Sequence, residues 1–301
     1  MDNFLFLPRF LAAATADIAY AGAFGFVLVG LWLKYDREAN LHRQLRRVVL
    51  GCTFALLLAL TAQTCVLTAT MAGATDLASI HDQFFSVITA THAGRVLLSE
   101  CVLTMLFIGL LFTLYGRQTR AGTWRLLTLL ILLAATRAAT GHASAEGNFS
   151  LPEFAQFVHI VSTAVWAGCI LAAGFVVLPA MLQARSSDGA ARFARRLSRA
   201  VTIALLLILL SGLYNSWRGL GGSLTPLVGT EWGRSLDLKL VLVGIALTLG
   251  AASRRMLGGN RDPSHHELSR LTRLVRIEAV VMLLVLAVSA WLANSPPANP
   301  G

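Results

Sequence analysis

The chain has 301 residues, of which 56% are hydrophobic and 13% are charged, and its mean hydropathy is +0.67. This composition excludes an ordinary soluble domain and indicates a polytopic membrane protein. The net charge of +10 would suit nucleic-acid binding, but the basic residues gather in particular loops between apolar spans. Such sorting is a signal of membrane topology, so we expect a lipid bilayer and no nucleic acid as the partner.

Eight apolar stretches are long enough to cross a bilayer, and short loops join them. We therefore expect an all-α fold, a polytopic bundle of eight transmembrane helices that forms a single integral membrane domain over residues 1–301. The spans are expected at roughly 10–33, 48–71, 93–115, 124–141, 153–182, 199–218, 234–253 and 272–293.

Most lysines and arginines fall in the loops after the first, third, fifth and seventh spans. The positive-inside rule places these four loops in the cytoplasm. Both termini and the loops at 72–92, 141–152 and 219–233 are then expected to face outward.

A short motif recurs in the chain. THAGRVL at 91–97 resembles TEWGRSL at 230–236, and the surroundings of Gly30 resemble those of Gly168 at nearly the same offset. These matches predict a parallel internal repeat of four spans plus four, with halves at 1–145 and 146–301. Matches this short also arise by chance, so a chain without a repeat is the alternative.

The fifth span begins with a recognisable helix start. Ser150 and Glu153 form a capping-box pattern around Pro152, which predicts a helix from about residue 151. This helix carries His159 about 12 Å along its axis, at about 1.5 Å per residue. Trp166 follows two turns later on the same face. An ionisable side chain inside a membrane span is a candidate functional residue.

Several potential metal ligands gather toward the outer side. Imidazole nitrogens suit copper, zinc or iron, and sulfur ligands favour Cu(I). The first candidates for a metal site are His142, His159 and His92, and the lesser candidates are Met71, Cys101, Cys65 and His81.

Two alternatives to this metal site stay open. In one, His159 hydrogen-bonds a neighbouring helix and His142 caps a loop. In the other, two histidines hold a b-type haem through axial bonds. The four cysteines lie in or at the ends of apolar spans and are not expected to form disulfides. His42, His265 and His266 are expected on the solvated cytoplasmic surface.

Charged residues also occur within the spans. Glu100 and Lys239 occupy equivalent places in the predicted repeat, so they are expected to line a passage between the halves or to form a structural ion pair, with Trp166 nearby. Glu278, near the cytoplasmic side, is expected to be structural or a gate residue. Since the chain contains no P-loop, phosphorylated-Asp or HExxH motif, a transporter or metal-binding protein is expected rather than an enzyme.

A series of motifs runs through residues from about 141 to 298. It begins with GHA at 141–143 and the H-x6-W-x-G pattern from His159 to Gly168. Three longer motifs follow: SGLYNSWRGLGG at 211–222, LVGTEWGRSLDLKLVLV at 227–243 and RIEAVVMLLVLAVSAWLANSPPA at 276–298. By these motifs, in this order, the segment resembles the copper resistance protein D (CopD) family.

The resemblance implies a multi-pass protein of a bacterial inner membrane with both termini in the periplasm. It implies that a copper ion is taken up at the periplasmic face, for import or for homeostasis and resistance, with a separate periplasmic CopC-like protein as partner. A rival expectation is a membrane redox protein that holds haem b or copper and transfers electrons, for example to reduce Cu(II). A third is a helical assembly partner without a metal of its own.

Overall fold

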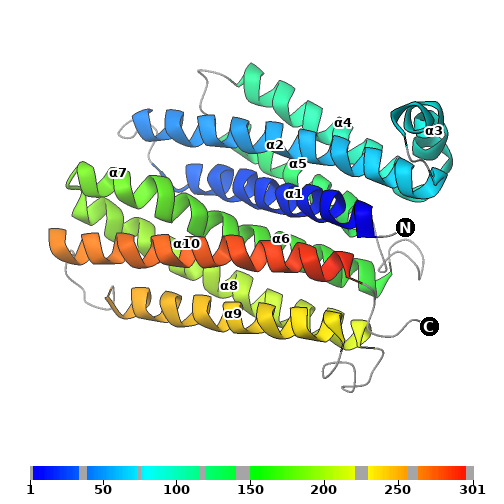
Figure 1. The fold of residues 1–301 in the computed structure, drawn as a ribbon. Coiled ribbons are helices and arrows are strands. Elements are labelled where there is room, and N and C mark those ends of the chain that lie inside the picture. The colour runs from blue at the N-terminus through cyan, green and yellow to red at the C-terminus, as the bar shows by residue number, and fades with distance from the viewer. Residues whose placement is uncertain are drawn as a thin grey trace.

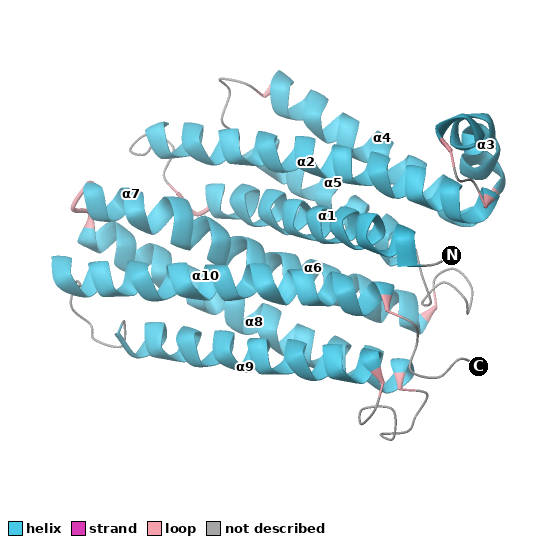
Figure 2. Cartoon of the chain, viewed as in Figure 1, coloured by secondary structure: helices cyan, strands magenta, loops and turns pink. Residues whose placement is uncertain are grey.

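The computed structural model describes residues 3–33, 39–73, 76–114, 119–139, 150–220, 230–256 and 264–295. Within these ranges every regular element is helical (Figure 2), which confirms the expected all-α fold. The elements are α1 (Asn3–Gly30), α2 (Ala39–Ala72), α3 (Leu77–Ala90), α4 (His92–Thr113), α5 (Arg120–Ala138), α6 (Leu151–Ala172), the π-helical segment η2 (Ala173–Val177), α7 (Leu178–Gln183), α8 (Ser187–Gly219), α9 (Glu231–Met256) and α10 (His265–Asn294).

Eight helical stretches in the described residues are long and apolar enough to cross a membrane, as predicted. The continuous helix of α6, η2 and α7 counts as one of them. Several spans begin earlier than expected. The difference is largest for α2, which begins at Ala39, and α8, which begins at Ser187, because their arginine-rich leading segments continue the helix. The chain is therefore a multi-pass helical membrane protein.

The segment expected as the loop 72–92 contains a further helix, α3. Asp76 caps it by accepting a hydrogen bond from the N–H of Ser79 at 2.8 Å. Thr91 then ends α3 and caps α4 through the N–H of Gly94 at 2.9 Å. This helix lies at one end of the bundle (Figure 1), which we call the α3 end; the opposite end, where α7 lies, is the α7 end. Helices α1, α4, α6 and α9 begin at the α3 end.

Helices α1 and α6 form the centre of the bundle, and each packs against the other, against α5 and against α10. Their closest approach is at Gly25 of α1 and Gly168 of α6. A Cβ atom on Gly25 would lie 1.9 Å from the carbonyl carbon of Gly168, so the two backbones touch. Such close packing through small residues is common between membrane helices, because dispersion contacts replace the hydrophobic effect there.

The packing of the two halves is similar in several respects. Helix α2 packs on α1 as α8 packs on α6, and α4 packs on α5 as α9 packs on α10. The starts of α4 and α9 also match, since the Thr230 hydroxyl accepts the N–H of Gly233 at 3.0 Å as Thr91 accepts that of Gly94. These likenesses agree with a parallel repeat, which stays a prediction.

Candidate functional site: buried charges and a histidine inside the bundle

A charged network lies where α1, α4 and α5 meet. Arg137, in the last turn of α5, forms an ion pair with Asp17 of α1, and its Nη1 lies 3.8 Å from Oε2 of Glu100 on α4. The guanidinium also stands over the ring of Tyr20, 5.5 Å from its centroid. Glu100 is only 3% exposed. One guanidinium thus partners two carboxylates, which lowers the cost of placing charges within a membrane.

Tyr20 ties this network to the helix that carries Arg137. Its hydroxyl donates to the carbonyl oxygen of Leu130 in α5 at 3.0 Å, so the buried phenol has its hydrogen-bond partner. The same ring receives the positive charge of Arg137 on its face. Together the contacts of Tyr20 and Asp17 fix α1 against α5 at this depth.

Lys239 of α9 supplies a second cation. It is close enough to interact electrostatically with the carboxylate of Asp17 and with the imidazole of His159. The network therefore contains the carboxylates of Asp17 and Glu100 and the cations Arg137 and Lys239. In this arrangement Glu100 is paired with Arg137, while the electrostatic partner of Lys239 is Asp17, so the two residues expected as an ion pair have different partners.

His159 of α6 faces α8. Its Nδ1 lies 3.2 Å from Oγ of Ser211, and a Cβ atom on the next residue, Gly212, would stand 3.3 Å from its Cε1. The Ser211 hydroxyl donates its one hydrogen to the carbonyl oxygen of Leu207 at 2.7 Å. It can then only accept from His159, which assigns the proton of the neutral ring to Nδ1. The lone pair of Nε2 is left as the ligand atom of this histidine.

Three of the predicted residues lie at a common depth. Glu100, His159 and Lys239 each follow the first residue of their helix by eight positions, in α4, α6 and α9. Because these helices begin at the same end, at about 1.5 Å per residue all three lie about 12 Å from the α3 end. The structure therefore brings His159 and Lys239 together with the charges around Glu100 in one layer of the bundle.

The other predicted ligands are more scattered. His92, exposed at the start of α4, has its Nε2 3.1 Å from the carbonyl oxygen of Ala139, the residue after α5. His81 on α3 is exposed beside Asp82, and Met71 is 56% exposed. Cys65 and Cys101 are half-buried and, as predicted, all four cysteines are free thiols.

The first candidate ligand, His142, lies outside the described residues. Within the parts of the chain that are described, no three His, Cys, Asp or Glu side chains converge closely enough to hold a metal ion. The predicted metal site at the outer surface thus stays a prediction.

Trp166 lies deeper in α6. It is 2% exposed, and its buried Nε1 has no hydrogen-bond partner. Its indole interacts with the carboxyl of Glu278 on α10. Trp166 is therefore not part of the charged network but belongs to a second polar region closer to the α7 end.

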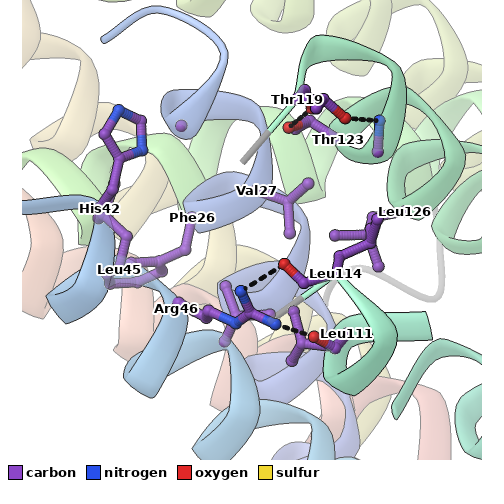
Figure 3. A pocket seen from close by; sticks show the side chains of 13 residues that line it. Phe26, Val27, His42, Leu45, Arg46, Leu111, Leu114, Thr119, Thr123 and Leu126 are labelled. Atoms are coloured by element: carbon purple, nitrogen blue, oxygen red, sulfur yellow. Dashed lines mark hydrogen bonds between the residues drawn. The ribbon is translucent and has the colours of Figure 1, made fainter. Parts of the chain in front are cut away.

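The expectation for His42 is wrong, although His265 and His266 are exposed as predicted. His42 is 5% exposed because α2 begins at residue 39 and its first turns pack into the bundle. It lines a cavity of about 80 Å³ near the α7 end, together with Arg46 and residues of α1, α4 and α5 (Figure 3). Arg46 donates hydrogen bonds there to the carbonyl oxygens of Leu111 and Leu114, and the distance to the Leu114 oxygen is 2.8 Å. These carbonyl groups lie at the C-terminal end of α4, so Arg46 caps this helix.

Sequence analysis missed two members of the network, Asp17 and Arg137. Both stand inside apolar stretches, as Glu100 and Lys239 do. Their charge within a predicted span was the signal that would have identified them as candidates.

Comparison with known proteins identifies the family. A family model described as "Copper resistance protein D-like, N-terminal domain" matches residues 4–151, and one described as "Copper resistance protein D" matches residues 191–292. A relative named "Copper resistance protein D", from Pseudomonas syringae pv. tomato, is 28% identical over 286 residues, which cover 91% of this chain and 92% of the relative. No solved structure matches. Since the two models match in series across both halves and the relative aligns end to end, the chain belongs to the copper resistance protein D family.

Proposed function

We propose that this copper-related membrane protein accepts a copper ion at the α3 end and relays it into the bundle past His159. Copper is the cargo in this proposal, and its movement serves import, homeostasis or resistance. The family supports the link to copper, since the matching models and the relative carry the name of copper resistance.

The observation that carries the proposal is the orientation of the His159 ring. The Ser211 hydroxyl accepts a hydrogen bond from Nδ1–H, which leaves the Nε2 lone pair inside the bundle. A hydrogen bond on one ring nitrogen fixes the tautomer and strengthens the other nitrogen as a ligand, as in many metal sites. Imidazole nitrogen binds copper in either oxidation state that biology uses.

His92 and His142 are the proposed partners nearer the surface. His92 contacts Ala139, and His142 follows Ala139 by three residues in the sequence. His142 itself lies outside the described residues, so its part in the path is proposed from the sequence alone. The proposed path therefore runs from His92 and His142 to His159.

The charged network offers a continuation between the halves. A copper cation leaving His159 meets carboxylates that are already balanced by Arg137 and Lys239. In the proposal, Glu100 and Lys239 shape the passage, because a carboxylate attracts a passing cation and an ammonium group repels it. Cys101, Cys65, Met71 and His81 are lesser candidates for contact with copper.

The proposed location is a bacterial inner membrane, with the α3 end and both termini in the periplasm. The support is the asymmetry of basic residues, since the loops and helix ends at the α7 end carry most of the arginines. A separate CopC-like protein of the periplasm is the proposed donor of copper at the α3 end. The alternative of a haem-binding redox protein has less support, because the facing helix offers His159 a serine and a glycine.

The test is the metal content of the detergent-purified protein. Wild type, His159→Ala, Ser211→Ala and the exposed control His266→Ala are loaded with copper, washed and examined by elemental analysis and visible spectroscopy. We expect bound copper to be lost in His159→Ala and retained in His266→Ala. In Ser211→Ala we expect the affinity for copper to fall by roughly 10–100-fold, because the imidazole ring loses the hydrogen bond that fixes its tautomer. Copper retained by His159→Ala, or a Soret band with stoichiometric iron in the wild type, would overturn the proposal.

A further inference from the structure

A second buried polar region lies around Glu278 of α10. Glu278 is 2% exposed and interacts with the indole of Trp166 on α6. On its other side stands Gly250 of α9, where a Cβ atom would lie 3.4 Å from Oε1 of Glu278. The missing side chain of Gly250 therefore makes the room that the carboxyl occupies between α6, α9 and α10.

Two buried polar groups on α6 and α9 lack a hydrogen bond of regular geometry. They are Nε1 of Trp166, which interacts with the Glu278 carboxyl without reaching that geometry, and Oγ of Ser253, three residues after Gly250 in α9. Buried donors without partners are rare in native structures and call for an explanation. Both are N–H or O–H donors, and such donors suit a carboxyl that becomes negatively charged during function.

The charge of Glu278 is not neutralised by a close partner. Among the described residues Glu278 has no ion pair, whereas Glu100 is paired with Arg137. Arg254, near the end of α9, interacts with Glu278 electrostatically and donates at 3.4 Å to the carbonyl oxygen of Ser198. An ionised carboxylate in the membrane interior without a paired cation is strongly unfavourable, so a proton or another cation is expected on it.

Other titratable groups on the neighbouring elements stand apart from Glu278. Segments η2 and α7 contain no ionisable residue. On α1, Asp17 and Tyr20 are engaged by Arg137, and on α6, His159 is engaged by Ser211. Among the described residues, Arg254 is thus the charged group that interacts with Glu278.

The helix opposite Glu278 has an irregular backbone. Shortly after Trp166, α6 changes into the π-helical segment η2, and its Gly174 packs against α10, where a Cβ atom would lie 2.9 Å from the carbonyl oxygen of Val275. Single π-helical turns of this kind occur frequently at functional sites. The π-helical segment thus packs against the turn of α10 that precedes Glu278.

The depth of this region differs from that of His159. Glu278 follows the first residue of α10, His265, by 13 positions, which is about 20 Å from the α7 end at about 1.5 Å per residue. Trp166 follows His159 by two turns of α6. A cation that passes His159 and continues along α6 therefore meets Glu278 next.

We propose that Glu278 is a proton-exchange site that couples the passage of the copper cation to the release of one proton toward the α7 end. In the resting protein the carboxyl is protonated. When a Cu(I) ion arrives, the O–H bond breaks, the proton leaves to solvent, and the carboxylate contacts the ion. One positive charge thus replaces another, without any redox step. Trp166 then donates to the carboxylate. This inference rests on the proposed transport of copper.

The test uses the full-length protein in two measurements. Infrared spectroscopy in lipid follows the carbonyl stretch of a protonated carboxyl, and proteoliposomes with an entrapped pH dye follow copper and proton movement together. We expect the wild type to show a carboxyl band that disappears when copper is added, and to release protons as copper moves. Glu278→Gln lacks the band and the proton movement but still binds copper at His159. Glu278→Asp restores both, and the exposed control Glu231→Gln behaves as wild type.

The outcomes separate the two proposals. Copper flux that persists in Glu278→Gln with unchanged proton movement overturns the exchange site and leaves copper transport standing. A wild type without the protonated-carboxyl band also overturns it, whether or not copper moves. If the band is present but copper neither binds nor moves, transport fails, and the coupling fails with it.

Discussion

Arg137 in the last turn of α5 forms an ion pair with Asp17 of α1, a residue 120 positions earlier in the chain. The same guanidinium lies 3.8 Å from Glu100 of α4. One side chain therefore joins three helices of the N-terminal half at the depth where the C-terminal half presents His159 and Lys239. The ion pair therefore holds these helices together and also lines one side of the proposed copper path.

Removing one member of this pair should destabilise the protein. Asp17→Asn leaves Arg137 with the more distant Glu100 as its remaining carboxylate, and breaking a buried pair typically costs about 3–5 kcal/mol. We expect such a loss in the free energy of unfolding, measured by chemical denaturation in detergent. The matched control is Asp188→Asn in the exposed pair with Arg192, where about 0–1 kcal/mol is expected. Equal effects in the two variants would show that the buried pair contributes little.

The fold could be predicted from the sequence to a large extent, because hydropathy over twenty residues is a local property. The eight spans were found in this way, with errors at the ends of α2 and α8, where arginines continue a helix past the apolar stretch. Helix α3 was missed because it is short and lies at the bundle end. His42 was predicted to be exposed for a related reason. Its neighbours in the sequence are basic, and the sequence did not show that the first turn of α2 packs into the bundle.

The candidate site could be predicted only in part. His159 was identified because a single histidine in an apolar span is conspicuous. Its partner Ser211 was not, since serine is common in membrane helices and the contact joins two helices far apart in the sequence. The pairing of Glu100 with Arg137 instead of Lys239 depends on how α4 packs on α5, which no local pattern contains.

The contact between Gly25 and Gly168 predicts a strong effect of a small substitution. In Gly168→Ala the new methyl group would lie 1.9 Å from the carbonyl oxygen of Ala21, and a rigid backbone cannot yield as a side chain can. Overpacking of this kind costs about 1–3 kcal/mol or more. We expect a lower thermal midpoint and a lower yield of monodisperse protein in size-exclusion chromatography.

The control for this variant is Gly244→Ala in α9, where no atom lies within 4 Å of the added Cβ. It should be neutral or slightly stabilising, because alanine favours a helix over glycine by about 1 kcal/mol. The same loss in both variants would contradict a specific contact between α1 and α6.

The proposed orientation predicts which residues a membrane-impermeant thiol reagent can reach. In a cysteine-free background, Asp82→Cys on α3 and His266→Cys at the start of α10 place single exposed thiols at opposite ends of the bundle. In intact spheroplasts the reagent should label Asp82→Cys and leave His266→Cys unmodified, since the arginine-rich end is expected in the cytoplasm. A membrane-permeant reagent should label both. Labelling of His266→Cys alone would reverse the orientation.

The cap of α3 predicts a dependence on pH at the α3 end. The hydrogen bonds that Asp76 accepts from the backbone N–H and the hydroxyl of Ser79 lower the pKa of its carboxyl. A lowered pKa in the folded state means that the cap stabilises α3 fully above the unfolded value of about 3.9, and that this stabilisation is lost as the pH falls through the lower, folded value. Hydrogen exchange of α3, corrected for intrinsic rates, should therefore accelerate in this acid range. Asp76→Ala should exchange faster at neutral pH and lose this dependence, whereas Asp82→Asn should retain it. Protection of α3 that is equal in wild type and Asp76→Ala at every pH would mean that packing against α2 and α4, not the cap, holds the helix.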